Sequence, residues 1–205
     1  MKRVGALSLR SLLFPLFFLF LCSCWIPENF VARVDVHRDG GYSFVYDGTL
    51  AFAPVLAAVS QGALSEEDKE ELKEMALELK DENGYQEFRY VGRGRFDVLA
   101  EKKGASGETY YFMSESTKIF AIEYPDDGTL KISALRPAGD VVRQLSSIGV
   151  TMSGKLNVTV PWGTKVIRHN ADREPFFFGL FGAYSWDIEE PDRSEEHTSE
   201  LQSPT

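Results

Sequence analysis

The chain has 205 residues, of which 22 are Lys or Arg and 31 are Asp or Glu, giving a formal net charge of -9 at pH 7. Hydrophobic residues make up 43% of the chain and aromatic residues 13%, which is too apolar for a wholly disordered protein. The acidic balance argues against nucleic acid as the main partner, because binding to phosphates requires a basic surface. Length and composition predict one folded domain, or two small ones, and identify no activity.

The N-terminus has the organisation of an export signal. Three basic residues precede an apolar run at residues 12–21 (LLFPLFFLFL), which is too short to span a bilayer as a helix of about 20 residues. The run ends in Leu21-Cys22-Ser23-Cys24, which resembles the lipobox of bacterial lipoproteins. Cys24 fits as the acylated residue because Leu21 and the small Ser23 precede it, whereas Cys22 directly follows a large residue. A plain secretory signal cleaved elsewhere is the alternative.

The C-terminus has a different character. Residues 193–203 (RSEEHTSELQS) resemble the translation of a common sequencing-library adapter, and Leu201 is the only sizeable apolar residue among them. A native polar tail is the alternative. We exclude residues 193–205 from functional reasoning, so His197 is not evidence for a site. The remaining body, residues 24–192, carries 18 basic and 28 acidic residues and a net charge of -10.

A β-hairpin is expected first in this body. Residues 31–37 and 42–46 alternate between apolar and polar side chains, and Asp39-Gly40-Gly41 between them favours a tight turn. Asp47-Gly48 is expected to break or bulge the second strand. Residues 24–30 are expected to be a short membrane tether ahead of the first strand.

Three helices are expected. Residues 53–61 are apolar and rich in Ala, with Pro54 suited to a first turn. Ser65 and Asp68 resemble a capping box that opens a second, acidic helix ending at Asn83-Gly84. Its apolar residues recur with helical spacing: Leu72, Met75, Ala76 and Leu79. A third helix is expected at residues 139–148.

The rest of the body has the pattern of short strands separated by turns. The expected strands are residues 86–91, 95–101, 109–112, 117–123, 129–133, 155–160, 165–169 and 183–188. Strands interrupted by separate helices predict an α+β fold: an antiparallel sheet that could close like a barrel, covered by two or three helices. We expect the export signal at residues 1–23, the tether at 24–30, one α+β domain at 31–192 and a disordered tail at 193–205.

No enzyme signature stands out, and we expect no catalytic residues, metal site or cofactor. His169-Asn170-Ala171-Asp172 could serve acid–base chemistry, but a turn in which Asn170 and Asp172 bind the backbone explains it better. Residues 126–128 fit a hairpin turn better than a calcium loop, and residues 92–94 lack the features of a phosphate loop.

One segment suggests binding rather than chemistry. Five large apolar side chains fall within seven positions, without clean alternation: Phe176, Phe177, Phe178, Leu180 and Phe181. Inside the core they would need burial on both sides. At the surface they would form an apolar patch of the kind that contacts a ligand, a partner or a membrane. Both possibilities remain open from the sequence.

A resemblance rests on residues 24–30 (CWIPENF), 39–48 (DGGYSFVYDG), 169–171 (HNA) and 179–188 (GLFGAYSWDI). These look like an uncharacterised family of proteobacterial lipoproteins, over nearly all of residues 24–190. The order of elements is also distantly similar to LppM-type lipoprotein domains, for which the resemblance implies an α+β, barrel-like body and lipid binding. Trp25, directly after the acylated Cys, implies the outer membrane in a Gram-negative host.

We therefore expect a non-enzymatic lipoprotein of the bacterial envelope, facing the periplasm and attached to the membrane by the lipid on Cys24. It would bind a lipid or other apolar ligand against the aromatic faces of the sheet and the segment from Phe176 to Phe181. The alternative is an assembly or scaffolding lipoprotein that contacts an envelope protein through the acidic helix at residues 65–80, without a ligand cavity. No nucleic-acid partner is expected.

Overall fold

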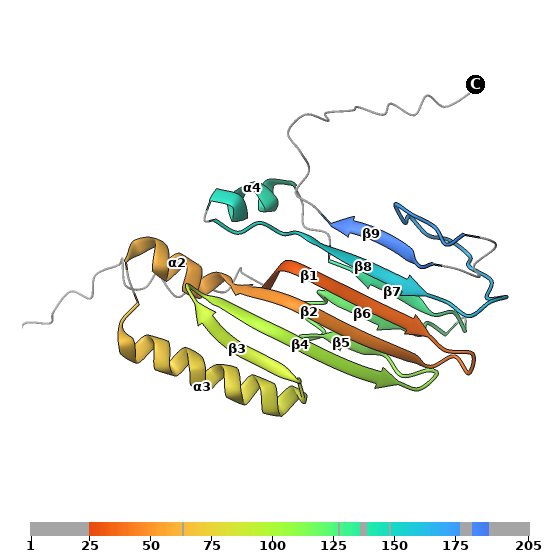
Figure 1. The fold of residues 1–205 in the computed structure, drawn as a ribbon, viewed down its shortest axis with the longest axis horizontal. Coiled ribbons are helices and arrows are strands. Elements are labelled where there is room, and N and C mark those ends of the chain that lie inside the picture. Colours follow the sequence, from red (N-terminus) through yellow and green to blue (C-terminus); the bar gives the residue numbers. More distant parts are fainter. Residues whose placement is uncertain are drawn as a thin grey trace, which may run out of the picture.

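The computed structural model of the chain describes residues 25–62, 64–126, 128–135, 139–147, 149–176 and 182–188. It has the α+β fold that the sequence predicts, with a six-stranded sheet in front of a three-stranded one (Figure 1). The strand orders are β3-β4-β2-β1-β8-β9 and β5-β6-β7. The strands are β1 (Trp25–Val36), β2 (Tyr42–Phe52), β3 (Glu87–Gly92), β4 (Arg95–Gly104), β5 (Tyr110–Phe112), β6 (Phe120–Glu123), β7 (Lys131–Ala134), β8 (Gly154–Thr159) and β9 (Tyr184–Ile188).

The first hairpin is confirmed. Strands β1 and β2 pair antiparallel, and Val36 lies opposite Tyr42 next to the turn. The Asp39 carboxylate accepts a hydrogen bond from the backbone N–H of Gly41 at 2.9 Å, and Gly40 has a φ of 83°, which favours glycine. Local turn chemistry therefore sets the register of the two central strands.

The expected tether is wrong for residues 25–30, which form the first half of β1. Trp25 lies opposite Phe52 in the β1–β2 ladder, and their rings stack with centroids 4.6 Å apart. The side chain of Glu28 is buried by a pairing with Arg95 across the sheet. These contacts to distant residues hold the segment in the sheet, so Cys24, the residue expected to be acylated, directly precedes a strand.

The irregularity expected at Asp47-Gly48 is present there in the β1–β2 ladder, but the extra residue lies in β1. Strand β2 runs through both residues, whereas the β1–β2 register shifts between Glu28 and Val31. Gly48 is needed because Phe30 crosses directly over it: a Cβ on Gly48 would lie 2.5 Å from the Phe30 Cβ. The glycine permits a close approach between strands rather than a break.

The larger sheet is mixed, not antiparallel as expected, because β8 runs parallel to β1. A parallel neighbour requires a crossover, since the chain must return to the end where the first strand begins. Residues after β7 and helix α4 make that return. Strands β3 and β9 end the larger sheet, so the described strands form two open sheets without a barrel-like closure.

The three expected helices are confirmed as α2 (Ala53–Gln61), α3 (Glu66–Asn83) and α4 (Gly139–Ser147). The capping box of α3 forms as predicted: Asp68 N–H donates to Ser65 Oγ at 3.1 Å, and Ser65 N–H donates to the Asp68 carboxylate at 2.9 Å. Leu72 and Ala76 are the buried residues of α3, which packs beside β3.

The main core lies on one face of the six-stranded sheet, where the three-stranded sheet and α3 cover it. Aromatic rings from the two sheets meet there, as in the stacked pair of Tyr46 and Phe112 with centroids 4.5 Å apart. Alternation along β2 directs Tyr42, Phe44 and Tyr46 to this face, and each is at most 1% exposed.

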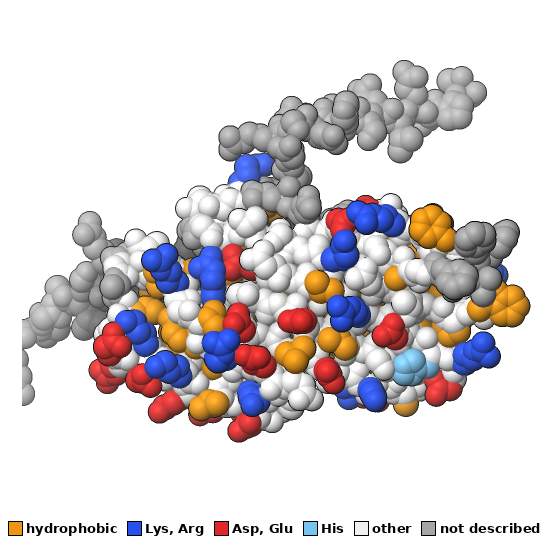
Figure 2. All heavy atoms as spheres, in the orientation of Figure 1, with side chains coloured by type: hydrophobic (Ala, Val, Ile, Leu, Met, Phe, Trp, Pro, Cys, Tyr) orange, Lys and Arg blue, Asp and Glu red, His pale blue; other side chains and the backbone are white. Residues whose placement is uncertain are grey.

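On the opposite face of the six-stranded sheet, Ile26 and Ala51 join a small second core near α2, against which Leu145 of α4 also packs. Elsewhere this face is open and carries mixed charges, and it is the side seen in Figure 2. The described residues contain no helix that is long and apolar enough to cross a membrane.

Candidate functional site

The structure describes only part of the site expected from the sequence. Cys24, Phe177, Phe178, Leu180 and Phe181 lie outside the described residues. Phe176 is described, and 74% of its surface is exposed. It therefore does not belong to the core, which was one of the two possibilities for this residue.

The aromatic face of the sheet, which was expected to receive an apolar ligand, is occupied by the protein's own side chains. Phe44, Phe112 and Phe120 contact one another there, with ring centroids 5.5 to 6.2 Å apart. Tyr42 and Tyr46 are fully buried in the same layer. An acyl chain could enter between the two sheets only by displacing these rings.

Large apolar side chains are exposed instead on the connection between β8 and β9. Trp162 is 66% exposed and Ile167 is 72% exposed, and Val166 also reaches the surface. Together with Phe176 they form what we call the distal loop, residues 161–176. Figure 2 shows large hydrophobic side chains protruding at this end of the molecule. An exposed apolar surface of this kind commonly marks a contact with a partner or a membrane.

Trp162, Val166 and Ile167 were missed by the sequence reasoning. Residues 165–169 were expected to form a strand, and the structure has no strand there. Val166 and Ile167 are adjacent, so a strand would direct them to opposite faces and leave one unburied. The signal that could have indicated an exposed loop is Trp162 next to Gly163, with the cations Lys165 and Arg168 close by.

Backbone hydrogen bonds join residues 172 and 173 of the distal loop to Ser185 of β9. The backbone N–H groups of Asp172 and Arg173 donate to the Ser185 carbonyl at 3.0 and 3.2 Å, and Ser185 N–H donates to the Arg173 carbonyl at 3.0 Å. The Arg173 guanidinium also pairs with the Asp187 carboxylate at 3.0 Å. This attachment lies between Ile167 and Phe176, so exposed apolar residues occur on both sides of a segment that is hydrogen-bonded to β9.

The His169-Asn170-Ala171-Asp172 cluster belongs to this attachment. The Asp172 carboxylate accepts a hydrogen bond from the Asp187 backbone N–H at 2.8 Å, so it binds the backbone as expected, but in strand β9 rather than within a local turn. Asn170 differs, because its side-chain oxygen accepts from the Trp186 indole N–H at 3.1 Å rather than from the backbone. The His169 ring packs against Tyr184 with centroids 4.8 Å apart. These contacts give the cluster a structural role.

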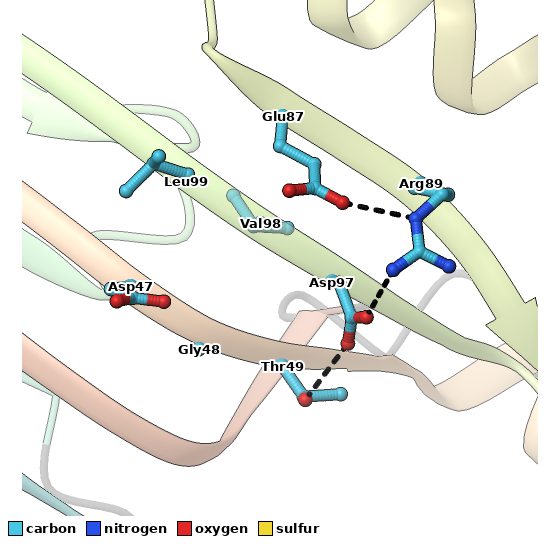
Figure 3. Close-up of a pocket in the computed structure, with 8 residues that line it drawn as sticks. All are labelled: Asp47, Gly48, Thr49, Glu87, Arg89, Asp97, Val98 and Leu99. Atoms are coloured by element: carbon cyan, nitrogen blue, oxygen red, sulfur yellow. Dashed lines mark hydrogen bonds and ion pairs between the residues drawn. The ribbon is translucent and has the colours of Figure 1, made fainter.

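A depression of about 310 Å³ lies on the open face of the six-stranded sheet (Figure 3). Arg89 extends across it and pairs with Glu87 at 2.9 Å and Asp97 at 2.8 Å. The hydrogen bond to Glu87, together with the nearby Asp97 carboxylate, raises the pKa of the Arg89 guanidinium. Thr49 Oγ1 also donates to Asp97 at 3.4 Å. The central charged groups are thus paired with one another, and this arrangement supplies no activated nucleophile.

Within the described residues, no group of three or more His, Cys, Asp or Glu side chains is arranged to hold a metal ion. Comparison of the chain with protein-family models, curated proteins and solved structures found no match. The distal loop is therefore the candidate site on its geometry alone.

Proposed function

We propose that this chain is a lipid-anchored protein of the bacterial envelope that binds an amphipathic partner through the distal loop, without a catalytic role. Acylation of Cys24 would attach it to the membrane. Binding would occur at an exposed surface rather than in an enclosed cavity. The partner is the lipid or other apolar molecule expected from the sequence, but the proposed contact is the distal loop and not the interior of the sheet.

The observation that carries the proposal is the contrast between the interior and the distal loop. Rings fill the space between the sheets, whereas Trp162, Ile167 and Phe176 are each about two-thirds or more exposed. A segment fastened by backbone hydrogen bonds to β9 keeps these side chains at the surface. Exposing large apolar groups in water is unfavourable, which supports a partner that covers them.

The alternative, a scaffolding protein that acts through the acidic helix, retains one supporting observation. Leu77 on α3 is 60% exposed among the carboxylates of that helix. An apolar side chain within an acidic surface suits a partner that is both basic and apolar. Leu77 and Ile167 thus mark the two competing surfaces.

Photo-crosslinking in living cells distinguishes these surfaces. A photoreactive amino acid is placed at Ile167 in one version of the full-length chain and at Leu77 in another. Both side chains are well exposed, at 60% for Leu77 and 72% for Ile167, so their accessibility is matched. We expect adducts from position 167 and none from position 77, because only the distal loop is proposed to contact a partner.

The outcomes separate the two proposals. Adducts from position 77 alone would replace the proposed function with the scaffolding alternative. If neither position gives an adduct in correctly exported protein, binding through either surface is refuted. Mass spectrometry of each adduct then identifies the partner as a lipid or a protein.

A further inference from the structure

We infer that the partner of the distal loop is an anionic lipid leaflet, on which the molecule lies along its β8–β9 edge. This inference rests on the proposed function and names the partner of the same surface. It follows from the side chains of the loop, from the distribution of charge across the sheet, and from the position of the anchored end.

The distal loop has the chemistry of a membrane-interface contact. Trp162 and Phe176 are aromatic, and Ile167 adds an aliphatic side chain between the cations Lys165 and Arg168. Aromatic rings favour the level of the lipid headgroups, and Lys and Arg are attracted to anionic lipids. Both cations are exposed, and neither forms an ion pair with another described residue.

Charge is distributed unequally between the two edges of the six-stranded sheet. Helix α3 has nine acidic and three basic residues, a net charge of -6, and it packs beside β3 at one edge. The distal loop lies at the other edge, beyond β8 and β9. Its 16 residues carry three cations and two acids, a net charge of +1, and both acids lie after residue 171. An anionic leaflet would attract this edge and repel the edge that carries α3.

The β8–β9 edge also offers a second contact near the opposite end. Helix α4 precedes β8 and lies on the same side of the molecule as β9 (Figure 1). It exposes the cation Arg143 and the apolar Val141, which is 41% exposed. Apolar and cationic groups thus occur towards both ends of this edge.

Trp25, next to the proposed anchor, lies at the end of β1 that is farthest from the distal loop. Strands β1 and β8 are parallel, so the distal loop lies beyond the end of β1 that is farthest from Trp25. The twelve residues of β1 separate these ends by about 36 Å. A molecule standing upright on its anchor would hold the distal loop at that height above the leaflet. The acyl anchor and the distal loop can therefore reach the leaflet together only if the sheet lies along the membrane.

Vesicle binding tests the inference in the full chain carrying Cys24→Ser, so that no acyl anchor is present. The probes are vesicles of phosphatidylglycerol with phosphatidylethanolamine, and vesicles of phosphatidylcholine alone. Variants are a triple serine replacement of Trp162, Ile167 and Phe176, the pair Lys165→Gln with Arg168→Gln, and the matched control Leu77→Ser. Circular dichroism confirms the fold of each. Any binding by the N-terminal apolar run is common to all of them.

We expect the triple replacement to weaken binding by about 100-fold, since each side chain loses apolar burial. The double glutamine replacement should weaken binding to anionic vesicles by about 30-fold and leave binding to phosphatidylcholine nearly unchanged. Leu77→Ser should have no effect. The fluorescence of Trp162 gives a readout that is independent of total binding. It is obtained by subtracting the spectrum of Trp162→Phe from that of the parent. On anionic vesicles this emission should shift to the blue and be quenched by spin-labelled lipid.

Unchanged emission from Trp162 on anionic vesicles would overturn the inference, and so would equal binding of the parent and the triple replacement. Adducts from position 167 that contain only protein would also overturn it, while leaving the proposed function intact. The absence of any adduct from position 167 in cells would instead refute the proposed function, whatever the vesicles show.

Discussion

Replacing Arg95 by Met should unfold this protein more readily than any change to a surface ion pair. Glu28 is 5% exposed, and its carboxylate receives Arg95 Nε at 2.8 Å and Nη2 at 3.2 Å. Arg95 Nη2 also donates to the Gly149 carbonyl at 2.7 Å, and Thr151 N–H donates to Glu28 at 3.2 Å. One ion pair therefore joins β1, β4 and the segment that leads into β8.

Removal of the guanidinium would leave the Glu28 carboxylate buried with one remaining donor. Breaking a buried pair from one side costs about 3–5 kcal/mol, because the remaining charge is uncompensated.

Urea unfolding followed by circular dichroism measures this cost. The matched control is Arg89→Met, which removes two ion pairs on the same sheet but from a side chain that is 61% exposed. The control should lose less than about 1 kcal/mol. The double variant Glu28→Met/Arg95→Met should be more stable than Arg95→Met alone, since no charge stays buried. A loss for Arg95→Met no larger than the control's would refute the reasoning.

Three further predictions concern the anchor, the strand crossing and the core. Cys24→Ser should release the protein from membranes and abolish labelling by a fatty-acid probe; continued labelling would contradict acylation at this residue. Gly48→Ala should cost about 1–3 kcal/mol in urea unfolding, because its Cβ would lie 2.5 Å from that of Phe30, whereas Gly62→Ala, with no atom within 4 Å, should cost little. Burial raises the pKa of the Tyr42 phenol to about 12, so unfolding releases its proton between pH 10 and 12, and stability should fall there as pH rises. The Tyr42 hydroxyl has no hydrogen-bond partner among the described residues, so Tyr42→Phe should reduce this alkaline loss and leave stability at pH 7 equal or higher.

The elements that the sequence predicts correctly depend on local signals. The hairpin at Asp39-Gly40-Gly41 needs only a turn that accepts a positive φ, and the residues that form this turn are adjacent. Helix α3 begins at a capping box formed by Ser65 and Asp68, three residues apart. In each case the residues that determine the structure lie within one turn of one another, so a single sequence is sufficient.

The errors concern contacts between distant residues. Nothing near Glu28 indicates that Arg95 will bury it, so residues 25–30 resembled a tether and not a strand. The parallel pairing of β1 with β8 likewise joins segments more than 120 residues apart. Residues 165–169 within the distal loop resemble a strand because Val166 and Ile167 favour strands locally, although no strand among the described residues pairs with them. Only the tertiary structure shows that these side chains are left at the surface.

The start of β1 at Trp25 bears directly on how strongly the distal loop must bind. The ring of Trp25 packs against Phe52, Phe88 and Phe96, so the strand is held in the sheet up to its first residue. An acyl chain on Cys24 would then keep the distal loop within about 36 Å of the leaflet at all times. Attachment at one point raises the effective concentration of the second contact to the millimolar range. A loop with only millimolar affinity for lipid would therefore be bound for much of the time in the acylated protein. The protein with Cys24→Ser should show the same contact only at millimolar lipid, which is the concentration at which the vesicle experiment has to be made.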